Sequence, residues 1–184
     1  LRFNHNRLQR PAVMDDLKLE NGKYIVFTLN RKALIADKEN LGNMIYAMNK
    51  AAGNTPIIAV LRNNAKEVVS QLTADMADIH IIDSLPYLEF GYLTAHAMGI
   101  ITDSGNVAEE ATFNNVPCIT LNSYTEHIET VKQGSNILVG EDADKLEAAI
   151  KDMTGNNWKK CSLPDRWDGR TAERIVHILL NMPG

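Results

Sequence analysis

Six short apolar runs alternate along this chain with longer amphipathic stretches, and this alternation constrains the fold most. Each run is almost continuously apolar, as in PIIAVL at residues 56–61, and does not alternate apolar with polar residues. Such strands are buried on both faces, which is typical of a parallel sheet covered by helices. The predicted strands are Tyr24–Leu29, Pro56–Leu61, Ile79–Ile82, Gly99–Thr102, Cys118–Leu121 and Asn136–Val139.

The stretches between these runs have the apolar spacing of helices. An alternation of strands and helices with short connections predicts an α/β domain with a doubly wound, Rossmann-like parallel sheet. Ligands of such sheets bind beyond the carboxyl ends of the strands. The predicted helices are Lys38–Ala52, Ala65–Ala74, Tyr87–Ala97, Val107–Asn114, Glu129–Gln133, Ala143–Thr154 and Thr171–Met182.

The length of 184 residues is enough for one domain with a substantial core. Residues 1–22 are polar and weakly periodic, and they are predicted to be a linker or interdomain segment with a short helix around Pro11–Leu17. Residues 23–184 then form the domain, closed by the last predicted helix. The chain opens on Leu, not Met, so we expect it to be a piece of a longer protein.

Composition excludes several classes of function. The net charge of −4 gives no basic footprint for nucleic acid. No apolar run approaches the roughly 20 residues of a membrane span, and the N-terminus has no apolar core of a signal peptide. The two cysteines, Cys118 and Cys161, are too few for a disulfide framework, and Cys118 is predicted to be a core residue. We therefore expect a cytoplasmic protein.

The segment Thr102–Gly105 (TDSG) ends an apolar strand and precedes a helix, which makes it the strongest candidate site. Backbone N–H groups at such a turn and the helix dipole favour a phosphate in front of Ser104 and Gly105. The alternative is a turn that only caps the helix. Glu109 and Glu110 follow one turn later; they are either a solvated face or acceptors for a sugar diol.

Three weaker candidates lie at other strand ends. Tyr87 and Phe90 are three residues apart on a helix and either stack on a nucleobase or pack in the core. Asn30, Arg31 and Lys32 follow the first strand, where the two cations either neutralise phosphate charge or belong to a solvated loop. Thr125 and Glu126 follow the fifth strand, where Thr125 could cap a helix and Glu126 could orient a ligand group. The histidines show no metal-ligand spacing, and we expect neither a metal nor a cofactor.

Taken together, these segments resemble the C-terminal half of non-hydrolysing UDP-N-acetylglucosamine 2-epimerases. The resemblance runs from about Gly22 to Leu180 and comprises five motifs in order. The family patterns are TLHR, YxxF, TDSGGxQEE, TERPE…G…LVG and DGxASERI. Their counterparts are Thr28–Arg31, Tyr87–Phe90, Thr102–Glu110, Thr125–Gly140 and Asp168–Ile175.

The resemblance implies one half of a two-domain, glycosyltransferase-B-like fold, with UDP held mainly by the C-terminal domain. Phe90 would pack on uracil, Ser104 and Gly105 would hold the diphosphate, and Glu110 would take the ribose hydroxyls. Asn30, Arg31, Thr125 and Glu126 complete the implied UDP site by their motif positions.

The family's reaction interconverts UDP-GlcNAc and UDP-ManNAc by anti elimination of UDP and its re-addition, in sugar-nucleotide metabolism for cell-envelope polysaccharide. The acid–base carboxylates lie in the N-terminal domain, so no catalytic residue is expected in this half, which by itself should be inactive. The implied partners are a UDP-sugar and the parent's N-terminal domain. A homodimer is also expected, because family members often dimerise.

Departures from the family pattern concentrate in polar positions that face the ligand. The family His of TLHR is Asn30, and an Asn cannot carry charge or shuttle protons. A degenerate, non-catalytic binder of nucleotide-sugars is therefore the alternative function, and a transferase using the same UDP site is a third. The other departures are Ala33-Leu34 for Glu-Asn, Arg62-Asn63-Asn64-Ala65 for an HPRT-like stretch, Asn106 for Gly, Ala108 for Gln, Asn122 for Arg and His127-Ile128 for Arg-Pro.

Overall fold

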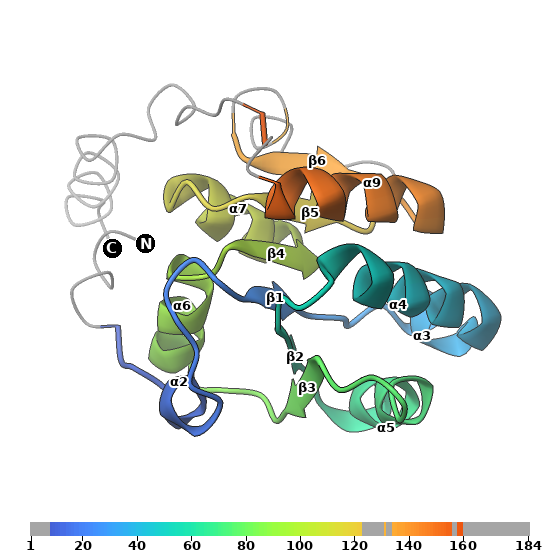
Figure 1. The fold of residues 1–184 in the computed structure, drawn as a ribbon, viewed down its shortest axis with the longest axis horizontal. Coiled ribbons are helices and arrows are strands. Elements are labelled where there is room, and N and C mark those ends of the chain that lie inside the picture. Colours follow the sequence, from blue (N-terminus) through green and yellow to red (C-terminus); the bar gives the residue numbers. More distant parts are fainter. Residues whose placement is uncertain (1–7, 123–130, 132–133, 156–157, 160–184) are drawn as a thin grey trace, which may run out of the picture.

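The protein forms a three-layer α/β domain around one parallel sheet (Figure 1). The structure is a computed structural model that describes residues 8–122, 131, 134–155 and 158–159. Its strands are β1 (Ile25–Phe27), β2 (Ile57–Val60), β3 (Ile79–Ile82), β4 (Gly99–Thr102), β5 (Cys118–Thr120) and β6 (Asn136–Leu138). Its helices are α2 (Ala12–Asp16), α3 (Lys32–Ala36), α4 (Lys38–Ala52), α5 (Asn63–Leu72), α6 (Tyr87–Ala95), α7 (Gly105–Phe113) and α9 (Ala143–Thr154).

The strand order is β3-β2-β1-β4-β5-β6, and every neighbouring pair is parallel. The central strand β1 pairs on one side with β2, where Ile25 lies opposite Ile57. On its other side it pairs with β4, where Ile25 lies opposite Gly99. This order reverses direction between β1 and β4, and ligands of doubly wound sheets bind at such a switch point. The predicted fold class is confirmed.

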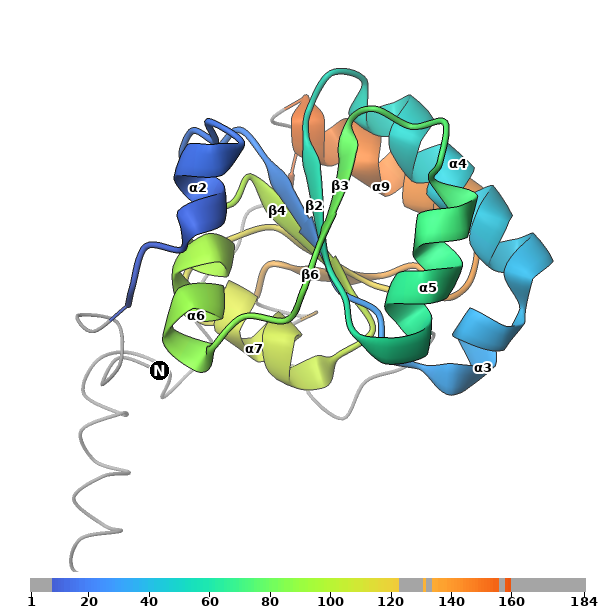
Figure 2. The ribbon, with the colours of Figure 1, turned by 90° about the horizontal axis from the view of Figure 1, so that it is seen from below.

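Side chains of the central strands alternate between two apolar layers. Ile25 and Phe27 belong to one cluster, with residues of α3, α4, α5 and α9, whereas Val26 belongs to the other, with residues of α2, α6 and α7. Figure 2 shows these two groups of helices on opposite sides of the sheet. Cys118 is fully buried in the second layer, as predicted, and burial raises the pKa of its thiol to about 12.

Two long helices of the first layer are well specified by the sequence. α4 and α9 pack along each other, and both have the predicted bounds. Asp37 caps α4 by accepting a hydrogen bond from the Asn40 amide, and Asp142 caps α9 by accepting from the amides of Asp144 and Lys145. An Asp at the N-cap satisfies amides that a helix leaves free. Local and tertiary preferences therefore agree in these helices.

Several element ends differ from the predicted ones. α7 begins at Gly105 and α5 at Asn63, each two residues earlier than predicted, because these polar or glycine turns carry no helical periodicity. α3 was not predicted, since a single turn of five residues is too short to show a period. The predicted helices at 129–133 and 171–182 lie wholly or largely outside the described residues.

The predicted linker segment contributes to the core. Within residues 1–22, α2 lies on the sheet face that carries α6, with Val13 and Met14 buried (Figure 2). The division at residue 22 stays a prediction.

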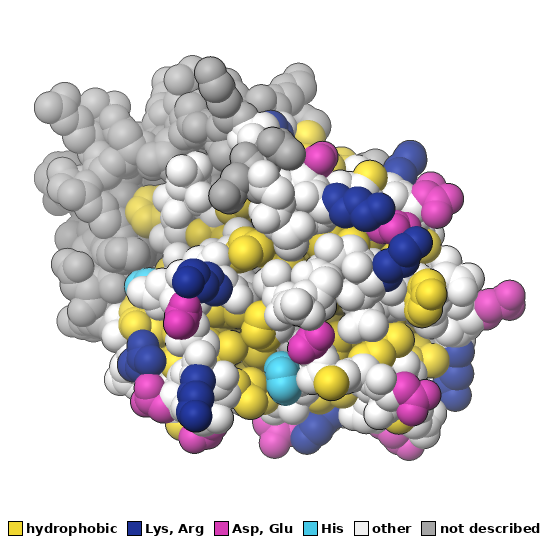
Figure 3. Space-filling model, viewed as in Figure 1, with side chains coloured by type: hydrophobic (Ala, Val, Ile, Leu, Met, Phe, Trp, Pro, Cys, Tyr) yellow, Lys and Arg dark blue, Asp and Glu magenta, His cyan; other side chains and the backbone are white. Residues whose placement is uncertain are grey.

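The surface mixes charges of both signs. In Figure 3 basic and acidic side chains are interspersed over the visible face and do not gather by sign. Among the helices that the structure describes, none is long and apolar enough to cross a lipid bilayer.

Candidate functional site

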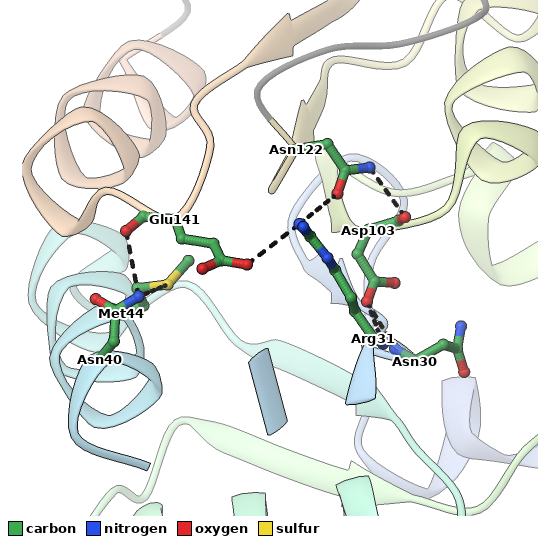
Figure 4. A network of polar contacts seen from close by, with 7 residues as sticks. All are labelled: Asn30, Arg31, Asn40, Met44, Asp103, Asn122 and Glu141. Carbon is green, nitrogen blue, oxygen red and sulfur yellow. Dashed lines mark hydrogen bonds and ion pairs between the residues drawn. The ribbon is translucent and has the colours of Figure 1, made fainter. Parts of the chain in front are cut away.

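The candidate site lies at one edge of the sheet, where the carboxyl ends of four parallel strands come together. Polar residues that follow β1, β4, β5 and β6 are linked there by hydrogen bonds and an ion pair: they are Arg31, Asp103, Asn122 and Glu141 (Figure 4). A pocket of about 330 Å³ opens beside them. It is lined by Asn30, Arg31, Asp103 and Ser104.

Asp103 joins the ends of β1 and β4. Its Oδ2 accepts hydrogen bonds from the backbone amides of Asn30 (2.9 Å) and Arg31 (2.6 Å). The Asp103 side chain therefore already binds the two backbone amides after β1 that could otherwise donate hydrogen bonds to an anionic ligand. Its Oδ1 is buried and has no hydrogen-bond partner among the described residues.

Arg31 supplies the positive charge among the described residues of the pocket lining. Its Nη1 donates to Asn122 Oδ1 (3.1 Å) and lies 3.1 Å from Glu141 Oε1. Asn122 in turn donates through Nδ2 to the Asp103 carbonyl (3.1 Å). In Figure 4 the guanidinium is turned toward Asn122 and Glu141, while the Asn30 side chain points away from this network.

The first turn of α7 presents its backbone amides beside the pocket. Ser104 is the N-cap residue, but its hydroxyl makes no capping hydrogen bond to the helix. Its backbone amide instead donates to Thr102 Oγ1 (3.0 Å), and Thr102 Oγ1 lies 2.6 Å from Thr28 Oγ1. The first-turn amides of a helix have no partner within the helix. This geometry favours the anion-binding interpretation of TDSG over that of a simple side-chain cap.

Glu110 lies further along α7, half-buried. Tyr87, the first residue of α6, donates its hydroxyl to Glu110 Oε1 at 3.3 Å. Burial raises the pKa of Glu110, and the Tyr87 hydrogen bond opposes this shift. Glu110 is therefore a partly desolvated carboxylate with one donor in place, not a freely solvated one.

The remaining predicted site residues have different outcomes. Phe90 lies on α6, one turn after Tyr87, and is partly buried against the second apolar layer, which agrees with the core-packing alternative. Stacking on a base stays a prediction. Gly105 opens α7. Thr125 and Glu126 lie outside the described residues.

Sequence reasoning did not assign Glu141 to the site, and it did not foresee that Asp103 binds the amides after β1 or that Tyr87 donates to Glu110. The available signal was position, because Asp103 and Glu141 each follow the end of a predicted strand, as Arg31 does. Parallel strands end at the same edge, so residues at these places meet. In the described ranges, no group of His, Cys, Asp and Glu side chains has the arrangement of a metal site.

Comparison with known proteins decides the family. The family model for UDP-N-acetylglucosamine 2-epimerase matches residues 1–180. The chain belongs to the UDP-N-acetylglucosamine 2-epimerase family. A UDP-N-acetylglucosamine 2-epimerase from Methanocaldococcus jannaschii is 36% identical over 165 residues, which are 85% of this chain and 44% of that relative. The chain therefore spans about half the length of the curated relatives it matches.

Solved structures of the epimerase family agree with this assignment. The Methanocaldococcus jannaschii enzyme in complex with UDP-GlcNAc and UDP is similar, with a TM-score of 0.69 and 36% identity, over 86% of this chain and 45% of that one. An Escherichia coli heptosyltransferase, 14% identical, shares the fold alone, with a TM-score of 0.55 over 81% of this chain and 45% of that one. The domain is thus one half of a glycosyltransferase-B-like architecture.

Epimerase relatives differ in the sugar named. A UDP-2,3-diacetamido-2,3-dideoxy-D-glucuronate 2-epimerase from Pseudomonas aeruginosa is 31% identical over 133 residues, which are 72% of this chain and 37% of that relative. The names of these relatives share the nucleotide and the 2-epimerase activity.

Proposed function

We propose that this chain is the UDP-binding half of a sugar-nucleotide 2-epimerase. In the complete protein it would interconvert UDP-GlcNAc and UDP-ManNAc by elimination and re-addition of UDP. The observation that carries the proposal is the pocket at the start of α7, with Ser104, whose hydroxyl does not cap the helix, at its wall and Glu110 on that helix. Six residues of helix rise about 9 Å, a separation that the diphosphate and ribose of one nucleotide can bridge.

This arrangement suits a bound leaving group. When the sugar C1–O bond breaks, negative charge develops on the diphosphate of UDP. The α7 amides, the Ser104 hydroxyl and the Arg31 guanidinium would stabilise that charge through oriented donors. Glu110 would accept hydrogen bonds from the ribose and keep UDP in place for re-addition. The proton removed from C2 would be taken by groups of the other half of the cleft.

We expect Ser104→Ala to weaken UDP binding. One hydrogen bond to a charged group in an open pocket corresponds to about a tenfold loss of affinity. Calorimetric titration of the chain with UDP measures this effect. The matched control is Ser70→Ala, an exposed serine on α5. Equal UDP affinity in wild type and Ser104→Ala would place the nucleotide elsewhere, and no UDP binding by the wild-type chain would contradict the proposal.

A degenerate, non-catalytic binder of nucleotide-sugars is the second candidate, and Asn30 favours it. Its side chain replaces the imidazole that the resemblance expects at this exposed position beside the pocket. An amide does not titrate near neutral pH and cannot act as a general acid or base. The proposal of an epimerase and this alternative make different predictions for the complete protein.

If the full-length protein is an epimerase whose activity has been reduced by substitutions such as Asn30, the variant Asn30→His should raise its turnover about tenfold or more. A gain of this size lies within the range that general acid–base groups contribute to enzyme rates. The measurement is the rate of C2 proton exchange in deuterated water with UDP-GlcNAc. Asn43→His, an exposed change on α4, is the control. Undetectable turnover in wild type and Asn30→His alike would support the non-catalytic binder.

A further inference from the structure

We propose that Glu141 competes with the diphosphate of the ligand for the Arg31 guanidinium and thereby sets the affinity of the pocket. This inference rests on the proposed function and names a residue that the proposed UDP site does not include. Glu141 follows β6 and precedes α9, whereas Arg31 follows β1, so the ion pair joins two loops far apart in the sequence.

The positive group that Arg31 brings to the pocket is already engaged. Among the described lining residues Arg31 is the cationic one, and its Nη1 is shared between Glu141 Oε1 and Asn122 Oδ1. Asp103 adds a second carboxylate and occupies the backbone amides of residues 30 and 31. An arriving diphosphate therefore meets a guanidinium already neutralised by a carboxylate (Figure 4).

The ion pair between Arg31 and Glu141 is weak enough for a phosphate to replace the Glu141 carboxylate. The side chains of Arg31 and Glu141 are 45% and 35% exposed, so water screens their attraction and the pair contributes little to stability. A phosphate offers the guanidinium a planar, two-point contact and more charge than one carboxylate. Asn122 holds Arg31 through a neutral oxygen, which can stay bonded when the carboxylate is displaced.

The backbone around Glu141 does not depend on its carboxylate. Asn40 Nδ2 donates to the Glu141 carbonyl at 3.3 Å, which anchors the loop to α4. A change of the side chain alone therefore removes the competing charge and leaves the loop attached. Glu141→Gln keeps the size of the side chain and is the test variant.

Glu147→Gln is a matched control in the same region. Glu147 lies on α9 and pairs with Lys50 and Lys151, whereas Glu141 pairs with Arg31. Both variants remove one negative charge from the chain. A general electrostatic effect on an anionic ligand would act on both alike, whereas release of Arg31 would act on Glu141→Gln alone.

The experiment is a titration of the full chain with UDP and with uridine at low and physiological ionic strength. Glu141→Gln should bind UDP about fivefold more tightly than wild type at low salt, with a smaller gain at higher salt. Uridine, which has no phosphate, should show no gain. In an Arg31→Gln background the gain from Glu141→Gln should disappear.

Two results would overturn the inference. If Glu141→Gln binds UDP no more tightly than Glu147→Gln, Glu141 does not compete. If the gain persists without the Arg31 side chain, Glu141 acts on the ligand and not through the guanidinium. UDP binding that falls in Ser104→Ala but does not rise in Glu141→Gln would remove this inference alone, while no UDP binding by any variant would remove the proposed function as well.

Discussion

Glu110→Ala is expected to lower the affinity for UDP by about 30- to 100-fold, because two hydrogen bonds from a ribose diol to a half-buried carboxylate would be lost. The Tyr87 hydroxyl, 3.3 Å from Glu110 Oε1, would also lose its acceptor. Calorimetric titration with UDP and with 2′-deoxy-UDP measures the effect. The loss should be several-fold smaller for the deoxy ligand, since it offers one hydroxyl fewer.

The neighbouring carboxylate is the control for this change. Glu109→Ala removes the same charge from the same turn of α7 but leaves the proposed ribose acceptor in place, so it should change UDP affinity by less than about threefold. If both variants lose affinity equally, the effect is a general loss of helix structure or charge. That result would contradict a specific role of Glu110 in holding the ribose.

We expect the variant Glu110→Gln to bind UDP more weakly than wild type but to be slightly more stable towards unfolding. Because burial raises the folded-state pKa of Glu110, the stability that its protonated form contributes is lost as pH rises through that pKa. Glu110→Gln cannot ionise, so above the ordinary glutamate pKa its melting temperature should exceed that of wild type by about 1–2 °C. The two should converge at lower pH. A lower melting temperature for Glu110→Gln at neutral pH would show that the carboxylate stabilises the fold.

Gly99→Ala is expected to destabilise the fold by about 2–3 kcal/mol, as overpacking of a dense core does. A Cβ at this position would lie 2.2 Å from Met153 Sδ and 3.0 Å from its Cγ. Met153 is itself buried in the first apolar layer, so its side chain can give way only by repacking against other core residues. Urea unfolding of wild type and variant measures the difference in the free energy of unfolding.

A double-mutant cycle assigns this loss to the contact with Met153. In a Met153→Ala background, Gly99→Ala should cost less than about 1 kcal/mol, because the clashing atoms are gone. Gly42→Ala on α4 is the control: its Cβ would meet Leu72 Cδ2 at an ordinary 3.7 Å, and Ala is the better helix former. Equal costs of Gly99→Ala in both backgrounds would place its effect elsewhere.

Gly99 lies at the end of β4 that is remote from the candidate site. Gly99 begins β4 and Thr102 ends it, about 10 Å away. The folded fraction of Gly99→Ala should therefore bind UDP as wild type does. Stability and binding would then be affected by different residues of the same strand.

Most of the sheet could be predicted from the sequence because strands buried on both faces appear in it as nearly continuous apolar runs. The bounds of β3 and β4 agree with the predicted ones, since Asp78 and Asp83 flank β3, while β4 opens on Gly99 and is followed by Asp103. The bounds of α4 and α9 agree because each has an aspartate at its N-cap and a clear amphipathic period. A single turn such as α3 carries no such mark.

The sequence predicted at which edge of the sheet the candidate residues lie, but not which hydrogen bonds they form with one another. Strand ends and the TDSG turn placed Asn30, Arg31 and Ser104 at one edge of the sheet, and these three residues line the pocket. Which donor meets which acceptor depends on side-chain contacts across loops. No local pattern says that Asp103 takes the amides of Asn30 and Arg31.

The sequence alone determined the doubly wound sheet, the edge that carries the site and the motifs of the epimerase family, because burial and turn chemistry act on neighbouring residues. The tertiary structure alone decided that Arg31 pairs with Glu141, 110 positions along the chain. It also decided that Tyr87 reaches Glu110. Charge pairing of this kind depends on distances of a few ångströms between loops, which only the packed sheet and its helices define.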